Sequence, residues 1–125
     1  MNNLMIDFSD PDCAVRRIFD LLSDKWTIRV LYILSLETQR YNQLRRELPG
    51  ISHKMLTQVL KQLEQDHLVK REVFPEIPPH VEYSLSELGQ SLIPHLFKIV
   101  LWAIEHSADL GWTEAVPEIA GTDQE

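Results

Sequence analysis

The chain has 125 residues, of which 44% are hydrophobic, 25% are charged and 8% are aromatic, and its formal net charge is −7. This is the composition of one globular domain, and it excludes collagen-like, low-complexity and predominantly disordered chains. No apolar run approaches the roughly 20 residues that cross a bilayer, and the acidic N-terminal segment does not resemble a secretory signal, so we expect a cytoplasmic protein without a membrane partner.

The first 36 residues predict two helices. Asp10-Pro11 offers an N-cap followed by proline at the first helical position, and the helix that it starts should end near Ser23-Asp24. A second helix is expected from about Lys25 to Leu36. Because this second segment is apolar around most of its circumference, we expect it to be the buried centre of the domain.

The next segment predicts a helix-turn-helix. A short helix should cover about Tyr41 to Leu48 and end at Pro49-Gly50, and Ser52 should cap a fourth helix that continues to about Asp66. The core positions of this fourth helix are Leu56, Val59, Leu60 and Leu63. A short helix, a tight turn with glycine and a longer polar-faced helix are typical of the motif, but turns of this kind are common.

Two β-type runs follow, at 68–74 and 81–85, and the second alternates in polarity. They are separated by FPEIPPH, whose three prolines cannot continue a strand ladder. A hairpin directly after a helix-turn-helix is a wing. This order of elements is much more specific than either half alone.

A last helix is expected from near Ser86 to about His106, with a kink at Pro94. It is apolar on two sides. One small domain can bury one of these faces, and a symmetric partner is the simplest cover for the second. We therefore predict a homodimer. The residues predicted at its interface are Ile93, Phe97, Val100, Leu101 and Ile104. The predicted organisation is an N-terminal arm (1–9), one domain (10–106) and an acidic tail (107–125) that is frayed from Trp112 onward.

Charge is unevenly distributed along the chain. The net charge argues against nucleic acid, because phosphate is bound largely by Lys and Arg. Between Arg40 and Arg71, however, seven bases stand against three acids, a local charge of +4, whereas six acids and no Lys or Arg occur from Glu105 onward. A basic middle with acidic ends indicates a DNA-binding segment, although a solvated basic surface would give the same pattern.

Several stretches, in this order, resemble the HxlR-type branch of the MarR-like winged-helix transcription regulators. They are Cys13 before a helix, Asp24-Lys25-Trp26-Thr27, Arg40-Tyr41-Asn42-Gln43-Leu44, the run from Leu48 to Thr57, the run from Pro78 to Leu85, and Trp102. The resemblance implies a mainly α fold with a small β-hairpin, in which dimerisation helices flank a winged helix-turn-helix domain at its N- and C-terminal ends. It also implies a homodimer that binds a roughly palindromic operator on double-stranded DNA. The chain departs from the family pattern at two histidines. His67 stands where the family usually has glycine, a position that predicts a left-handed helix end. His80 stands at a wing position that is often arginine.

The exposed face of the fourth helix provides the residue types that read bases. Lys suits guanine O6 and N7, Gln suits adenine N6 and N7, and Thr can contact a thymine methyl group. Basic residues outside this helix would contact phosphates, which gives affinity without sequence information. The predicted DNA-binding residues are Arg40, Gln43, Arg46, Ser52, His53, Lys54, Thr57, Gln58, Lys61, Lys70, Arg71 and His80.

Cys13 is the only cysteine, so an internal disulfide is excluded. We expect it in the first turn of the first helix, where the helix N-terminus and nearby Arg16 and Arg17 favour a reactive thiolate and Asp10 and Asp12 oppose it. In the HxlR-type family that the chain resembles, a cysteine in this neighbourhood serves some members as a redox or electrophile sensor. The resemblance therefore implies a small molecule or an electrophile as a candidate effector. A small buried hydrophobic residue is an equally good interpretation.

No metal or cofactor is predicted, because the five histidines show no paired ligand spacing. An enzyme is disfavoured, since the sequence contains no nucleophile elbow or phosphate loop. The alternative to a DNA-binding regulator is a winged helix used only for protein–protein interaction, which the acidic total and the His80 wing favour.

Overall fold

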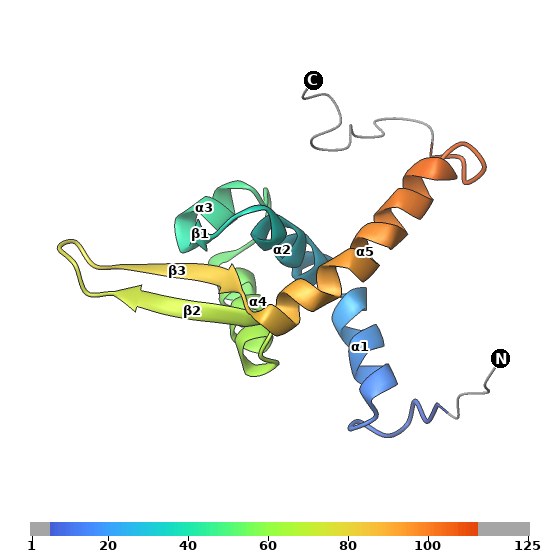
Figure 1. Cartoon of the computed structure of the whole chain (residues 1–125), viewed down its shortest axis with the longest axis horizontal. Helices are drawn as coiled ribbons and strands as arrows, with labels where there is room; N and C mark the ends of the chain where they lie inside the picture. The colour runs from blue at the N-terminus through green and yellow to red at the C-terminus, as the bar shows by residue number, and fades with distance from the viewer. Residues whose placement is uncertain (1–5, 113–125) are drawn as a thin grey trace. The chain divides into compact units, whose positions relative to one another are not determined.

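The computed structural model describes residues 6–112 (Figure 1). In chain order the elements are α1 (Ala14–Ser23), α2 (Lys25–Leu36), β1 (Gln39–Arg40), α3 (Tyr41–Arg46), α4 (His53–Gln65), β2 (Val69–Phe74), β3 (His80–Leu85) and α5 (Glu87–Glu105). The chain divides into two compact units between Ser91 and Leu92, inside α5. Within the described range, no helix has the length and apolar character needed to cross a membrane.

The core of the first unit is built around α2, as predicted. Asp24 caps this helix, because its Oδ1 accepts hydrogen bonds from the amides of Trp26 (2.9 Å) and Thr27 (3.3 Å). The buried residues of α2 are Thr27, Val30, Leu31, Ile33 and Leu34, and those of α4 are Leu56, Val59, Leu60 and Leu63. These two helices therefore supply most of the apolar interior on which the exposed surfaces of the unit rest.

The predicted start of the first helix is wrong. Asp10 does not cap a helix; its side chain accepts a hydrogen bond from the amide of Asp12, and its carbonyl accepts one from Cys13. The residues that the Asp-Pro pair predicted as a first helical turn therefore form this local turn instead. Consequently α1 begins at Ala14, and Cys13 is its N-cap rather than part of its first turn.

The turn between α3 and α4 places the two helices of the motif. Its buried residues are Leu48 and Ile51, and Gly50 has a φ of +93°, which favours glycine. Ser52 caps α4 as expected, because its Oγ accepts from the amide of Met55 at 3.0 Å. At the other end His67 adopts the predicted left-handed conformation (φ 62°). There the amide of Leu68 bonds to the carbonyl of Leu63, which closes the helix end.

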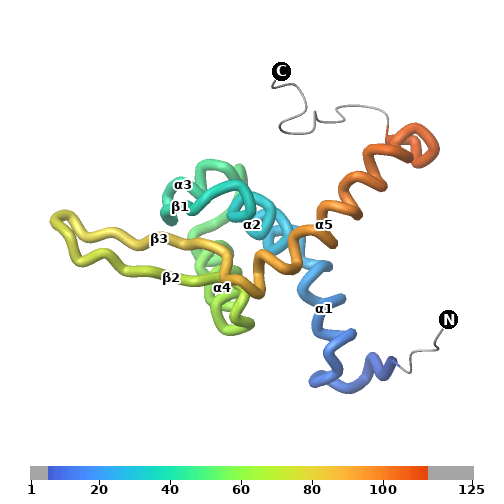
Figure 2. Tube along the Cα trace, viewed as in Figure 1, coloured from blue at the N-terminus to red at the C-terminus, as the bar shows by residue number. Residues whose placement is uncertain are grey.

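The predicted hairpin is present and belongs to a three-stranded antiparallel sheet of order β1-β3-β2. The hairpin register runs from Val69 opposite Leu85 to Phe74 opposite His80. The third strand, β1, was not predicted, because two residues are too few to show a period. The hairpin extends beyond the helices α2, α3 and α4 of its own unit (Figure 2).

The first turn of α5 packs tightly against the chain that leaves α4. A Cβ built on Gly89 would lie 2.1 Å from the carbonyl oxygen of Leu68, so only glycine allows this approach. Ser86 fixes the same junction: its Oγ accepts from the amide of Gly89 (2.9 Å) and donates to the carbonyl of His67 (2.6 Å). The predicted bounds of this helix, Ser86 to about His106, agree with the observed α5 (Glu87–Glu105) to within one residue at each end.

Most of α5 is exposed in the single chain. Gly89 is the only buried residue of α5, and because residues 92–105 belong to the second unit, burial of one apolar face of this helix by the domain stays a prediction. The exposed large apolar residues of the helix are Leu88, Phe97, Ile99, Val100 and Trp102. The helix α5 continues through Pro94. Residues 113–125, most of the predicted acidic tail, lie outside the described range.

Candidate nucleic-acid interface

The outer face of α4 carries the predicted base-reading side chains. Lys54, Gln58, Lys61 and Gln65 are all exposed, and so is His53 at the first position of the helix, whereas Thr57 is half-buried. Within residues 6–112, none of the seven Lys and Arg between Arg40 and Arg71 takes part in an ion pair. These side chains are therefore not held in ion pairs within that range and are available to phosphates.

Tyr41, which the sequence analysis did not select, links the two helices of the motif. It is the first residue of α3, and its Oη lies 2.6 Å from Nδ1 of His53, the first residue of α4. The same Oη lies 3.1 Å from the carbonyl oxygen of His53 and 3.5 Å from Oγ1 of Thr57. The two residues are twelve positions apart across a turn, and no sequence pattern indicates such a contact.

Gln43 has a structural role at the start of α3. Its Oε1 accepts a hydrogen bond of 2.7 Å from the amide of Arg40, which precedes the helix. An arginine side chain has no acceptor, so it cannot return the bond as Ser or Thr would in a capping box. The exposed guanidinium of Arg40 thus takes no part in this cap. Of the amide group of Gln43, which was predicted to contact DNA, Oε1 already accepts a hydrogen bond from the backbone.

The C-terminal end of α3 adds a basic residue that the predicted site omitted. Arg45 and Arg46 are adjacent and exposed, and both line a shallow hollow of about 430 Å³ together with Asn42, Leu48, Gly50 and Ile51. Since two arginines line one open hollow, this region carries positive charge of the kind that binds phosphate. The doubled arginine in the sequence was the signal that could have included Arg45.

The wing separates the two basic residues predicted on it. Lys70 and Arg71 are consecutive on β2, so their side chains leave opposite faces of the sheet. Arg71 pairs with Tyr83, on the face that buries Val69. Lys70 pairs with Ser84 and lies on the outer face. The two residues therefore cannot contact phosphates through the same face of the hairpin.

His80 lies among carboxylates rather than facing solvent. Its Nε2 is 3.1 Å from Glu82 and its Nδ1 is 3.6 Å from Glu76, and its ring stacks on Phe74 with centroids 4.8 Å apart. The side chain is only 16% exposed. Glu72 is directly opposite Glu82 in the register, so the wing concentrates negative charge around this histidine. The predicted contact of His80 with DNA would have to compete with these neighbours.

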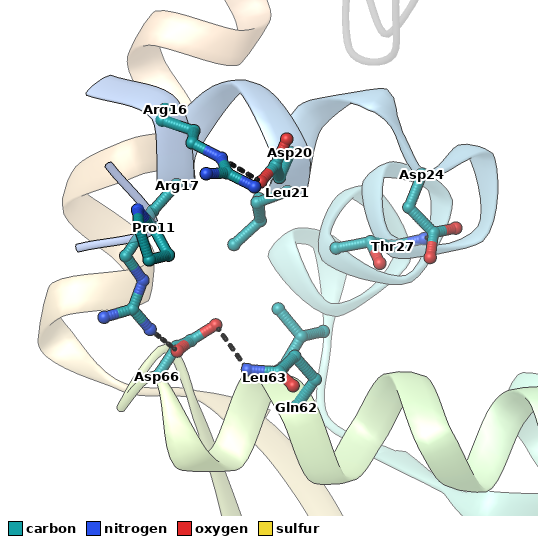
Figure 3. A pocket seen from close by; sticks show the side chains of 10 residues that line it. All are labelled: Pro11, Arg16, Arg17, Asp20, Leu21, Asp24, Thr27, Gln62, Leu63 and Asp66. Carbon is teal, nitrogen blue, oxygen red and sulfur yellow. Dashed lines mark hydrogen bonds and ion pairs between the residues drawn. The ribbon is translucent and has the colours of Figure 1, made fainter. Parts of the chain in front are cut away.

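Cys13 is half-buried at the start of α1. The two arginines expected to activate it are engaged with carboxylates: Arg16 lies 3.6 Å from Asp20, and Arg17 lies 3.2 Å from Asp66 at the end of α4. These pairs border a cleft of about 290 Å³ formed by α1, α2 and α4 and the residues before α1 (Figure 3). The cleft also has apolar walls, from Leu21 among others.

A helix-turn-helix with an exposed, polar second helix, a basic surface and a β-hairpin wing defines a winged helix-turn-helix protein of the DNA-binding class. The sequence matches the HxlR-like helix-turn-helix family over residues 21–109. The chain belongs to this family of transcriptional regulators, which are not enzymes.

Individual relatives agree with this assignment. The uncharacterized HTH-type transcriptional regulator YdeP of Bacillus subtilis is 36% identical over 115 residues, which covers 90% of each chain. The reduced form of the redox regulator HypR is similar with a TM-score of 0.72 and 36% identity, over 78% of this chain and 96% of that one. The reduced form of the transcriptional regulator YodB of B. subtilis has a TM-score of 0.67 and 35% identity, over 73% and 90%.

Proposed function

We propose that the protein is a cytoplasmic homodimeric regulator that recognises a roughly palindromic operator through α4. The observation that carries this proposal is the outer face of α4, where Lys54, Gln58 and Lys61 are exposed beside basic residues that form no ion pair within the described part of the chain. Lysine and glutamine match acceptor and donor patterns of the major groove. The residues around α4, with Ser52 at its N-terminus and Arg40, Arg45 and Arg46 on and beside α3, would hold the phosphates.

The apolar surface of α5 supports the homodimer. Phe97 and Val100 of the predicted interface are exposed, and Ile93, Leu101 and Ile104 are half-buried. Exposed apolar area of this kind on a helix is unfavourable in water and is removed by association. A two-fold dimer would present two copies of α4, and half-sites about 34 Å apart would then be read from one side of the duplex.

Selection of bound duplexes from a random pool, followed by fluorescence anisotropy at 50–200 mM salt, tests this proposal. We expect an inverted repeat and an affinity that falls steeply with salt. Lys54→Ala should relax preference at one base position, whereas Arg46→Ala should weaken binding to all duplexes and flatten the salt slope. Equal affinity for selected and random duplexes would contradict sequence recognition, and a monomer at micromolar concentration in sedimentation would contradict the dimer.

We further propose that Cys13 senses oxidants or electrophiles, which the redox regulator HypR among the structural neighbours supports. Cys13 occupies the N-cap position of α1, and α1 reaches the end of α4 through Arg17 and Asp66, so a modification that displaces α1 acts on the reading helix. The cleft beside these residues is the place proposed for a small effector. Mass spectrometry after electrophile treatment, combined with anisotropy, tests the switch. Full modification of Cys13 with unchanged operator affinity would eliminate it.

The charge of the wing favours a second candidate, a winged helix that binds another protein. Glu76 and Glu82 lie beside His80 and Glu72 lies opposite Glu82 on the hairpin, and these three carboxylates would repel phosphates. This alternative predicts a weak, sequence-independent affinity for DNA and a protein partner that is lost when exposed α5 residues such as Phe97 are changed. The same selection experiment separates the two candidates, because only the regulator enriches a defined sequence.

A further inference from the structure

The phenol of Tyr41 has one proton to donate and three polar atoms within reach, of which the carbonyl oxygen of His53 is always an acceptor, while Nδ1 of His53 and Oγ1 of Thr57 can each donate or accept. Its Oη is nearest to Nδ1 of His53, at 2.6 Å, while the carbonyl oxygen of His53 and Oγ1 of Thr57 are more distant, at 3.1 Å and 3.5 Å. The two rings meet edge to face, with centroids 5.2 Å apart and an interplanar angle of 60°. The imidazole is thus held by both a short hydrogen bond and an aromatic contact.

We propose that Tyr41 is a positioning residue that fixes the tautomer of His53 and makes this histidine a hydrogen-bond donor toward DNA. The proposal rests on the proposed function, in which the N-terminal end of α4 faces the bases. A neutral imidazole carries one N–H, and the nitrogen that accepts a hydrogen bond is the one without the proton. We assign the phenol proton to the shorter contact, from Oη to Nδ1 at 2.6 Å, rather than to the carbonyl oxygen of His53 at 3.1 Å. With this direction the ring proton is on Nε2, whereas a phenol that donated to the carbonyl would accept from Nδ1–H and give the opposite tautomer.

The Nε2–H group is left free for a ligand. His53 is exposed, and within residues 6–112 its ring forms a hydrogen bond only with Tyr41. A fixed N–H donor matches acceptors, which are guanine O6 and N7, adenine N7, thymine O4 or a phosphate oxygen. It is mismatched with the amino groups of adenine and cytosine. A histidine without the phenol would exchange tautomers and rotate, and could present either character, so the phenol adds selectivity.

The tautomer can be measured on the free protein without DNA. In ¹⁵N-labelled protein above pH 7.5, the imidazole nitrogen shifts of His53 should show an unprotonated Nδ1 and a protonated Nε2. Tyr41→Phe removes the hydroxyl and keeps the ring, so the shifts should move toward a mixture of tautomers. A wild-type imidazole with its proton on Nδ1, or shifts that are identical in the two proteins, would overturn the proposal.

A double-mutant cycle with DNA tests the consequence for recognition. Tyr41→Phe should weaken binding to the selected operator by about 3- to 10-fold, the range of one lost hydrogen bond, and broaden the preference at one base position. In a His53→Ala background the same change should have no further effect, because Tyr41 acts through His53. Tyr32→Phe is the matched control, since Tyr32 is an exposed tyrosine on α2 and has no hydrogen bond to His53. Circular dichroism should show that all variants are folded.

The outcomes separate the inference from the function on which it rests. If the wild-type protein does not distinguish its selected operator from random duplex, the proposed function fails whatever the tautomer of His53. If the wild-type protein does select an operator while Tyr41→Phe leaves base preference unchanged, or while the cycle is additive, the proposed function stands and the role of Tyr41 is overturned.

Discussion

The guanidinium of Arg17 lies 3.2 Å from the carboxylate of Asp66, and this contact joins α1 to the C-terminal end of α4 across 49 positions of sequence. Asp66 also accepts a hydrogen bond from Gln62 one turn earlier in α4, at 3.2 Å (Figure 3). The helix that begins at Cys13 and the helix proposed to read DNA are therefore connected by a named pair of side chains.

Arg17→Gln should uncouple α1 from α4 with little loss of stability. The arginine side chain is 58% exposed, so the pair should contribute less than about 1 kcal/mol to folding. If the pair transmits the proposed response, electrophile treatment should change operator affinity less in this variant than in the wild-type protein, as anisotropy measures. Arg16→Gln is the control, because Arg16 pairs with Asp20 inside α1 and its loss should leave the response intact. Equal responses in both variants would contradict this route.

Gly89→Ala should be strongly destabilising. The added Cβ would meet the carbonyl oxygen of Leu68 at 2.1 Å, and either α5 or the chain after α4 must shift. Overpacking of this kind costs about 1–3 kcal/mol. Thermal unfolding at one fixed protein concentration measures the effect, with the exposed neighbour Gln90→Ala as a control that should change stability little. A melting temperature equal to that of the wild-type protein would contradict the packing described for this turn.

His67→Gly should stabilise the fold. A residue with a Cβ in the left-handed region, here with φ 62°, carries a penalty of about 1–2 kcal/mol that glycine avoids. Glycine loses more entropy on folding, so we expect a net gain of up to about 1 kcal/mol in urea denaturation. The hydrogen bond that the carbonyl of residue 67 accepts from Ser86 is kept. Gln65→Gly, inside α4, should instead destabilise; similar effects of both changes would argue against strain at position 67.

Glu72→Gln should strengthen DNA binding without changing its base preference. Glu72 is exposed and faces Glu82 across the hairpin, so its removal reduces both repulsion between carboxylates and repulsion of phosphates. Lys70→Gln on the same face should weaken binding and reduce the salt slope by about one. Anisotropy over a salt series measures both. If neither variant alters affinity, the outer face of the hairpin does not lie near the duplex.

The sequence predicted elements whose signals are local. Ser52 marked the start of α4 because its side chain caps the next turn, and the alternation at 81–85 marked β3. The start of α1 was misplaced because the side chain of Asp10 satisfies the amide of Asp12 in a turn of its own, an alternative that the pattern Asp-Pro does not distinguish from a helix cap.

The candidate site was predicted less completely than the fold. The exposed residues of α4 follow from helical periodicity, so Lys54, Gln58 and Lys61 were identified correctly as surface positions. The contact of Tyr41 with His53 and the carboxylates around His80 depend on how separate segments meet, and no local period encodes such meetings. The opposite faces of Lys70 and Arg71, by contrast, follow from the strand period that the sequence already indicated at 68–74, although both residues were predicted together as DNA contacts.

Strand β1 ends at Arg40 and α3 begins at Tyr41, with no intervening loop, while Arg40 is paired in register with Glu82 of the hairpin. The backbone ladder therefore ties the hairpin to the first helix of the motif, and slack that a flexible connection would supply is absent at this point. We therefore expect the hairpin and α3 to bind a duplex as one unit. A bend or twist of the hairpin on binding should then be transmitted to α3.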